Sequence, residues 1–108
     1  MTEINIEQFF NDLPKYFLPE KAVGIDAVVQ INLTGKKSGD WVLTIHNQKC
    51  RVEKGTVSNP LLSLTMDYAE FISIFRGELD PMRAFMMGKI RLKGNVALAT
   101  RLTSMFNM

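Results

Sequence analysis

The segment "RGELDPMRAFMMGKIRLKGN", residues 76–95, contains the sequence patterns of two different secondary-structure elements within a short length of chain. Asp80 followed by Pro81 is typical of a helix start, because an aspartate side chain accepts from free N–H groups there and proline needs no N–H at the first helical position. Gly88 is typical of a helix end, and basic and apolar residues alternate after it. The segment therefore predicts a short helix followed by an amphipathic strand.

The apolar residues of this segment predict which sides of the two elements face inward. We expect Met82, Phe85 and Met86 to form one apolar face of the helix. In the strand over 89–94, we expect the apolar side chains to point inward and the cations Lys89, Arg91 and Lys93 to point outward. Outward cations also protect an edge strand from pairing with other sheets, so a structural explanation of these charges stays open.

Upstream, the spacing of apolar residues predicts one helix, then four strands, then a second helix. Helical spacing begins at Ile6 and should end at Pro14. Alternating apolar residues predict strands over 27–35, 40–45, 49–53 and 61–66. After the last of these the period becomes helical, with Asp67 and Glu70 spaced as in a capping box and Gly77 at the helix end.

A last helix begins after Asn95, which is suited to cap it. Its apolar stripe consists of Leu98, Leu102, Met105 and Phe106. Because each predicted strand has one apolar face, the simplest packing is a sheet with helices over one side. We therefore expect an α+β fold with a five-stranded, mainly antiparallel sheet.

Length and composition favour one globular domain over residues 1–108. A chain of 108 residues with 46% hydrophobic and 22% charged residues is typical of a folded domain, and too short for two cores. The single cysteine excludes an internal disulfide. Since the N-terminus lacks a signal peptide and no apolar run reaches the ~18 residues of a membrane span, we expect a cytoplasmic protein.

The charges are distributed unevenly along the chain. A net charge of +2 is too small to predict nucleic-acid binding. After Asp80, however, every charged residue is a cation: Arg83, Lys89, Arg91, Lys93 and Arg101. These cations either keep solvated faces soluble or attract an anionic surface such as lipid headgroups.

The sequence offers little for catalysis or metal binding. His46 and Cys50 together would still leave a metal short of at least two ligands, and the inward phase of Cys50 indicates an inert thiol. The carboxylates at the predicted helix starts are explained as parts of helix caps. No glycine-rich loop has phosphate-binding spacing. We expect no enzyme, no metal and no cofactor; an enzyme of unrecognised type is the least favoured alternative.

Methionine and phenylalanine are concentrated late in the chain. They are Met82, Met86, Met87, Met105 and Met108, with Phe75, Phe85 and Phe106. Methionine is flexible and polarizable, so it suits both irregular cores and adaptable binding surfaces. Composition alone favours a core, but a ligand cavity stays open as an alternative.

A spaced pattern in this same region resembles the SCP-2 sterol-transfer family. The matching residues are Gly77, Leu79, Asp80, Pro81, Ala84, Phe85, Gly88, Lys89, Ile90, Leu92, Gly94 and Asn95. The resemblance implies a stand-alone member with a five-stranded sheet and an apolar tunnel for fatty acyl chains, sterols or other lipids, without metal or redox cofactor. By position, the implied lipid-binding wall is Phe71, Phe75, Phe85, Met86, Leu98, Leu102, Met105 and Phe106. Met87 departs from the family pattern, which often has Gln or Ser there.

The resemblance implies a non-enzymatic carrier that takes up and releases an apolar lipid. In that hypothesis Arg83, Lys89, Arg91 and Lys93 approach an anionic membrane, and a helix moves aside to admit the lipid. The alternative is an accessory module whose tunnel is filled by Met and Phe. Such a module would recruit a partner in lipid or quinone metabolism, or form a homodimer through the exposed side of "KYFL", residues 15–18.

Overall fold

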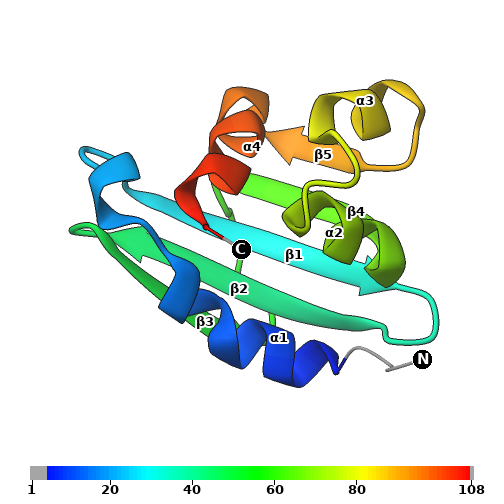
Figure 1. Cartoon of the computed structure of the whole chain (residues 1–108), viewed down its shortest axis with the longest axis horizontal. Coiled ribbons are helices and arrows are strands. Elements are labelled where there is room, and N and C mark those ends of the chain that lie inside the picture. The colour runs from blue at the N-terminus through cyan, green and yellow to red at the C-terminus, as the bar shows by residue number, and fades with distance from the viewer. Residues whose placement is uncertain (1–4, 108) are drawn as a thin grey trace.

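The computed structural model of this chain describes residues 5–107, so the inferences made above for residues 1–4 and Met108 lie outside it. A five-stranded sheet has α-helices on one of its faces (Figure 1). The strands are β1 (Ala27–Thr34), β2 (Gly39–His46), β3 (Lys49–Lys54), β4 (Leu62–Asp67) and β5 (Arg91–Gly94), in the spatial order β3-β2-β1-β4-β5. The predicted α+β fold is confirmed.

Within residues 5–107, four α-helices occur in the predicted places: α1 (Ile6–Asp12), α2 (Tyr68–Phe75), α3 (Pro81–Met86) and α4 (Val96–Leu102). Short 3-10 helices cover Leu13–Tyr16, Pro19–Lys21 and Thr103–Met105. Each α-helix begins with a side-chain cap, in which Asn5, Asp67, Asp80 and Asn95 accept from the backbone N–H of Gln8, Ala69, Met82 and Leu98 respectively. The predicted caps at Asp67, Asp80 and Asn95 are confirmed.

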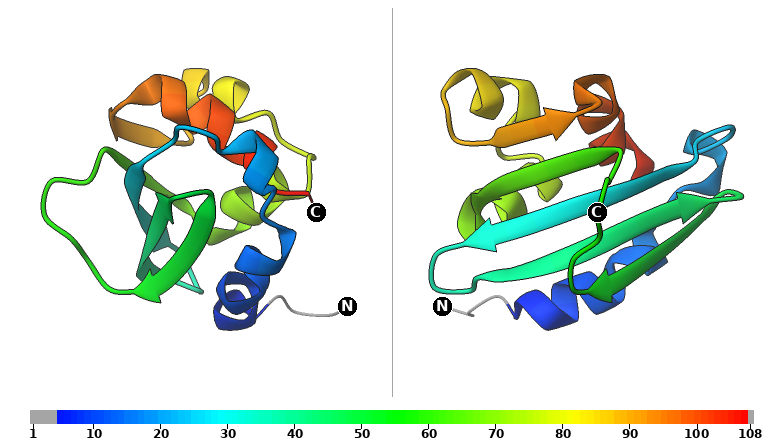
Figure 2. Two further views of the ribbon diagram at one scale, coloured as in Figure 1. Left: turned by 90° about the vertical axis from the view of Figure 1, so that its left-hand side faces the viewer. Right: turned by 180° about the vertical axis from the view of Figure 1, so that it is seen from behind.

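The sheet contains one parallel pair. β1 is antiparallel to β2 but parallel to β4, and β4 is antiparallel to β5. The connection over residues 55–61 therefore carries the chain from β3 past β2 and β1 to β4, and Figure 2 (left) shows it on the side away from the helices. Alternation in the sequence predicts which face of a strand is buried, but it does not identify the neighbouring strand.

Gln30 on β1 holds this connection against the outer face of the sheet. Its side chain is 5% exposed and donates to the backbone oxygens of Trp41 and Gly55, each at 3.1 Å. Its Oε1 accepts from the Val57 N–H at 2.9 Å. A buried amide that satisfies both its donor and its acceptor stabilises the connection without an unpaired polar group.

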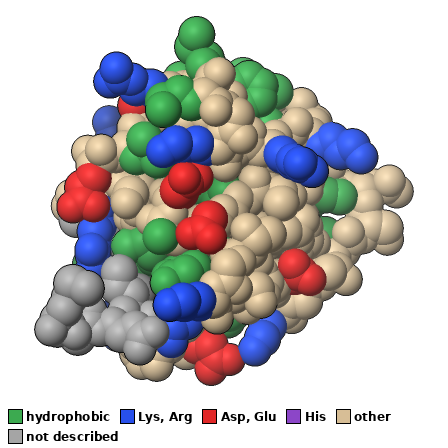
Figure 3. Space-filling model, turned by 90° about the vertical axis from the view of Figure 1, so that its right-hand side faces the viewer, with side chains coloured by type: hydrophobic (Ala, Val, Ile, Leu, Met, Phe, Trp, Pro, Cys, Tyr) green, Lys and Arg blue, Asp and Glu red, His purple; other side chains and the backbone are tan. Residues whose placement is uncertain are grey.

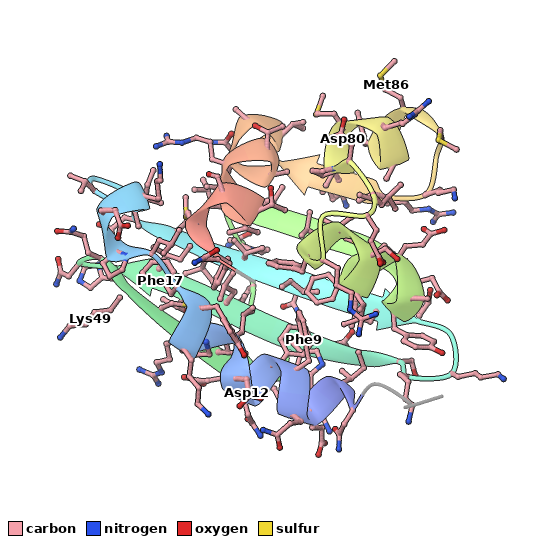
Figure 4. All side chains as sticks on the ribbon, in the orientation of Figure 1. Phe9, Asp12, Phe17, Lys49, Asp80 and Met86 are labelled. Atoms are coloured by element: carbon pink, nitrogen blue, oxygen red, sulfur yellow. The ribbon has the colours of Figure 1, made fainter. Side chains whose placement is uncertain are left out.

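The core lies between the sheet and the helices. Aromatic side chains from α1, β2 and α2 pack there, and Phe10 stacks between Trp41, with ring centroids 4.3 Å apart, and Phe71, at 5.3 Å. Phe9 contacts the same cluster from α1 and is labelled in Figure 4. The N-terminal helix therefore covers the half of the sheet formed by β2 and β3.

The C-terminal segment is joined to the segment after α1. The Leu18 N–H donates to the Met105 oxygen at 2.7 Å, and the Asn107 N–H donates to the Tyr16 oxygen at 2.8 Å. These bonds fix the chain beyond α4 over the core. Within residues 5–107, no helix has the length and apolar character needed to cross a bilayer.

Candidate functional site

An apolar cavity lies between α2, α3, α4 and the inner face of β4 and β5. Its wall consists of Leu64, Met66, Phe71, Ile74, Phe75, Pro81, Met82, Ile90, Leu92, Ala99, Thr100, Leu102 and Thr103. Only the two threonines carry polar side-chain atoms. Such a lining can hold a hydrocarbon chain through dispersion and the hydrophobic effect, and it offers almost nothing to a polar ligand.

The cavity is small in this conformation. Its volume is about 30 Å³, which is room for about one or two water molecules. Pockets that hold small-molecule ligands measure about 300–1,000 Å³. The structure therefore shows a closed state, and a lipid chain can enter only if surrounding side chains or a helix move.

The cavity comes nearest to solvent between α3 and α4. Met82 on α3 lines the cavity and is 39% exposed, and Thr100 on α4 lines it and is also exposed. The remaining wall residues are buried or half-buried. The boundary between α3 and α4 is therefore the mouth of the cavity.

Six of the eight predicted wall residues are buried in this part of the core. Phe71, Phe75 and Leu102 line the cavity. Leu98, Met105 and Phe106 are buried beside it but do not line it. The structure thus brings the stripes of α2 and α4 together, as the helical spacing predicts.

Phe85 and Met86 lie on the surface of α3. Phe85 is 37% exposed and Met86 82% exposed, whereas Ala84 is fully buried. The expected inward face of α3 is therefore wrong for these two residues, although their contact with lipid stays a prediction. The physical reason is that α3 is apolar almost all round, so spacing does not define its buried side, and a small Ala side chain allows α3 to pack closely.

Several wall residues were missed because the expected wall used helices alone. Leu64 and Met66 on β4, together with Ile90 and Leu92 next to or on β5, line the cavity from the sheet side. Their inward phase was already predicted by alternation, and this signal could have found them. Met82 was already expected on the apolar face of its helix, whereas Ala99 and the two threonines had no such signal.

The four cations predicted to approach a membrane are all exposed. Arg83 lies on α3, and the Lys89 ammonium lies 3.7 Å from the Glu70 carboxylate on α2. Arg91 and Lys93 lie on β5 with Ser63 and Thr65 of β4, on the outer face of the sheet. Arg83 and Lys89 therefore lie at or next to α3, Arg91 and Lys93 lie on the opposite face of the sheet, and none of the four lines the cavity.

His46 and Cys50, from which neither catalysis nor metal binding is expected, do not line the cavity. The His46 ring contacts the Asp26 carboxylate at the exposed end of β2, opposite the apolar wall. Burial raises the pKa of the Cys50 thiol to about 12, so it stays protonated at neutral pH. Among residues 5–107, no group of three or more His, Cys, Asp or Glu side chains is placed to hold a metal ion.

Comparison with protein families gives a match along nearly the whole chain. The model described as the SCP-2 sterol transfer family matches residues 8–107. The chain belongs to the SCP-2 sterol-transfer family. Membership supports lipid binding or transfer as its general role.

Curated relatives are much longer than this chain. Hydroxysteroid dehydrogenase-like protein 2 of Xenopus laevis is 33% identical over 98 residues, which is 90% of this chain and 24% of the relative. This SCP-2 chain therefore spans about a quarter of that protein's length.

Solved structures show the same fold. A sec-alkylsulfatase from Pseudomonas has a TM-score of 0.88 at 20% identity, covering 97% of this chain and 17% of its own. Sterol Carrier Protein 2 Like 2 from Aedes aegypti has a TM-score of 0.69 at 22% identity, covering 92% and 90%. The latter protein has also been solved in palmitated form, with a TM-score of 0.65 at 22% identity, covering 92% and 87%. The architecture thus occurs both as a small carrier and as a minor part of a larger enzyme.

Proposed function

We propose that this chain is a non-enzymatic carrier that binds an apolar lipid between α2, α4 and the sheet and transfers it between membranes. The lipid would be fatty acyl, sterol-like or isoprenoid, and no metal or cofactor takes part. The observation that carries the proposal is the almost wholly apolar wall of the cavity. The palmitated Aedes relative supports a fatty acyl chain as ligand. A single cysteine, unpaired, supports a cytoplasmic location.

Opening is least costly at α3. Helix α2 contributes four buried residues and α4 contributes three, whereas Ala84 is the buried residue of α3. Moving α3 therefore exposes the least apolar area. Since Met82 on α3 also lies at the mouth of the cavity, we propose that the lipid enters between α3 and α4.

The magnitudes allow reversible binding. Burying a sixteen-carbon chain at ~0.8 kcal/mol per methylene yields about 12 kcal/mol. Association and ordering take back about 4–15 kcal/mol. At the smallest of these costs about 8 kcal/mol remains, which corresponds to micromolar affinity and permits both uptake and release.

A fluorescent fatty acid titrated into the purified protein tests the carrier proposal. We expect saturable binding, and a loss of about tenfold or more in affinity for Met82→Asp, because the new carboxylate would lie at the mouth of an apolar cavity. Val23→Asp is the matched control, since Val23 is 65% exposed and does not line the cavity. No saturable binding, or equal affinity in both variants, contradicts the proposal.

The small cavity volume favours a second candidate, an accessory module whose interior stays filled by side chains. The length of the hydroxysteroid dehydrogenase-like relatives supports this candidate, because in them the matching region is part of a larger protein. Native mass spectrometry of the protein purified from cells, with lipid analysis of an extract, separates the two. A bound lipid supports the carrier, and a lipid-free monomer or homodimer that also fails the titration supports the module.

A further inference from the structure

We propose that the outward face of α3 docks on the surface of an anionic lipid bilayer. This inference rests on the carrier function proposed above and names the surface from which the lipid is taken. We call this face the α3 patch and define it as Met82, Phe85, Met86 and Met87.

The α3 patch is an exposed apolar surface next to the mouth of the cavity. Its side chains are 39%, 37%, 82% and 58% exposed, in the order given. Figure 3 shows hydrophobic side chains gathered at the top of the molecule, where α3 lies, with both cations and carboxylates near them. Figure 4 shows Met86 pointing away from the rest of the chain. Contiguous exposed apolar surface of this kind marks an interaction site.

The orientation of α3 produces this patch. Ala84 is buried, so the larger apolar residues on the other sides of the helix point outward. Arg83 lies three and four positions before Met86 and Met87, and residues at these spacings are neighbours on a helix surface. A cation is therefore placed directly beside the most exposed methionines, as in helices that lie in a bilayer interface.

The charge around the patch identifies the occupant. From residue 81 to residue 107 the chain contains five cations and no acidic residue. Arg83 lies on α3 and Lys89 follows it, 3.7 Å from Glu70, whereas Arg91 and Lys93 lie on the outer face of the sheet and Arg101 lies on α4. An anionic bilayer attracts the Arg83 cation within the patch, whereas a second copy docked symmetrically on the same patch would bring two Arg83 cations together. Charge complementarity thus favours an anionic bilayer over self-association.

The patch is also continuous with the cavity. Met82 belongs to the patch and lines the cavity wall. When α3 rests in the interface, its apolar side chains are stabilised by lipid, which lowers the free-energy cost of moving α3 off the core. Docking and opening are then one event, and the lipid tail meets the mouth of the cavity without crossing water.

Vesicle cosedimentation of the purified protein tests the proposal. We expect binding to vesicles of phosphatidylcholine with phosphatidylglycerol, weaker binding to phosphatidylcholine alone, and a decrease with added salt. Arg83→Ala should lower partitioning about fivefold. Met87→Glu should lower it about tenfold or more, because an apolar contact is replaced by an anion. Val23→Glu is the matched control, since residues 22–25 precede β1 at the end of the sheet far from α3 (Figure 1).

The fatty acid titration, done without vesicles, separates this inference from the carrier function. Met87 does not line the cavity, so Met87→Glu should keep wild-type affinity for fatty acid while losing vesicle binding. Wild-type protein that binds fatty acid but not anionic vesicles overturns the docking proposal and leaves the carrier function standing. Light scattering that shows a dimer dispersed by Met87→Glu, without vesicle binding, also overturns it and assigns the patch to a second copy.

Discussion

Ala84 and Met86, two positions apart on α3, have opposite surroundings: Ala84 is fully buried and Met86 is 82% exposed. In a helix packed on a core the larger apolar side chain is ordinarily the buried one. Here the short side chain permits close packing of α3, and the long one is directed to solvent. The two positions should therefore respond in opposite ways to substitution.

Enlarging Ala84 should destabilise the fold, and shortening Met86 should not. Ala84→Leu forces extra methylenes into a packed contact, and we expect a loss of about 1–3 kcal/mol. Met86→Ser removes only exposed atoms and should stay within about 0.5 kcal/mol of wild type. Urea unfolding measures both. If Met86→Ser were less stable than Ala84→Leu, α3 would have to pack on the core through a different face from the one that contains Ala84.

Gly94 should not tolerate a side chain. It has φ +101°, and a Cβ there would lie 2.3 Å from the Leu61 oxygen, which accepts from the Asn95 N–H at 2.9 Å. Gly94→Ala must therefore both strain the backbone and separate β5 from β4, at a cost of about 3 kcal/mol or more. Gly88→Ala is the control, with φ +78° and nothing within 4 Å of the new Cβ. It should cost about 1–2 kcal/mol, and equal losses in thermal unfolding would contradict the steric explanation.

Replacing Gln30 should loosen the connection over residues 55–61. Gln30→Leu keeps the size of the side chain but leaves the Gly55 oxygen and the Val57 N–H without their partner. We expect a loss of about 1–3 kcal/mol and faster hydrogen exchange at the Val57 amide. Gln30→Glu retains an acceptor for that amide and should protect it better than Leu does. Unchanged exchange in Gln30→Leu would mean that other contacts hold the connection.

Cys50 should react poorly with iodoacetamide while the protein is folded. Burial raises its pKa from the ordinary 9.0 to about 12. At pH 8 the thiolate fraction is then about a thousandfold below that of an exposed cysteine. We expect slow alkylation in buffer and ordinary alkylation in urea, followed by mass spectrometry. Val57→Cys combined with Cys50→Ala supplies an exposed thiol as control, and fast alkylation of folded Cys50 would contradict its burial.

The raised pKa of Cys50 also predicts the direction in which the stability of the fold changes at high pH. The folded state holds the thiol proton more tightly than the unfolded state does, so the Cys50 contribution is fully present below pH 9.0. It decreases as the pH rises from there towards about 12. Cys50→Ala should therefore flatten the stability profile in that alkaline range, and a profile that matches wild type would contradict this contribution.

Local features of the fold could be predicted from the sequence because they depend on neighbouring residues. The caps at Asp67, Asp80 and Asn95 act within the next turn of chain, and each is found in the structure. The change from strand to helix after Met66 is likewise visible in the period of the apolar residues. These signals need no knowledge of distant contacts.

Features that depend on distant contacts could not be predicted in this way. β1 pairs with β4 because of the path of the connection that Gln30 holds. The sequence shows only a polar residue in an alternating strand, and this does not indicate that its side chain is buried against a distant segment. The orientation of α3 is set by how closely Ala84 packs, whereas its sequence is apolar on nearly every side. The volume of the cavity depends on all of its wall residues at once.

The bonds between the segment after α1 and the C-terminal segment have a consequence during synthesis. Leu18 and Tyr16 leave the ribosome well before their partners, Met105 and Asn107, which lie far later in the sequence. A nascent chain shorter than this can form the β1–β2 hairpin, whose contacts are local, yet it must wait for residue 107 before the C-terminal segment can close over the core. The C-terminal segment therefore makes its contacts late, and the apolar stripes of α2 and α4 are synthesised before that segment can close over the core.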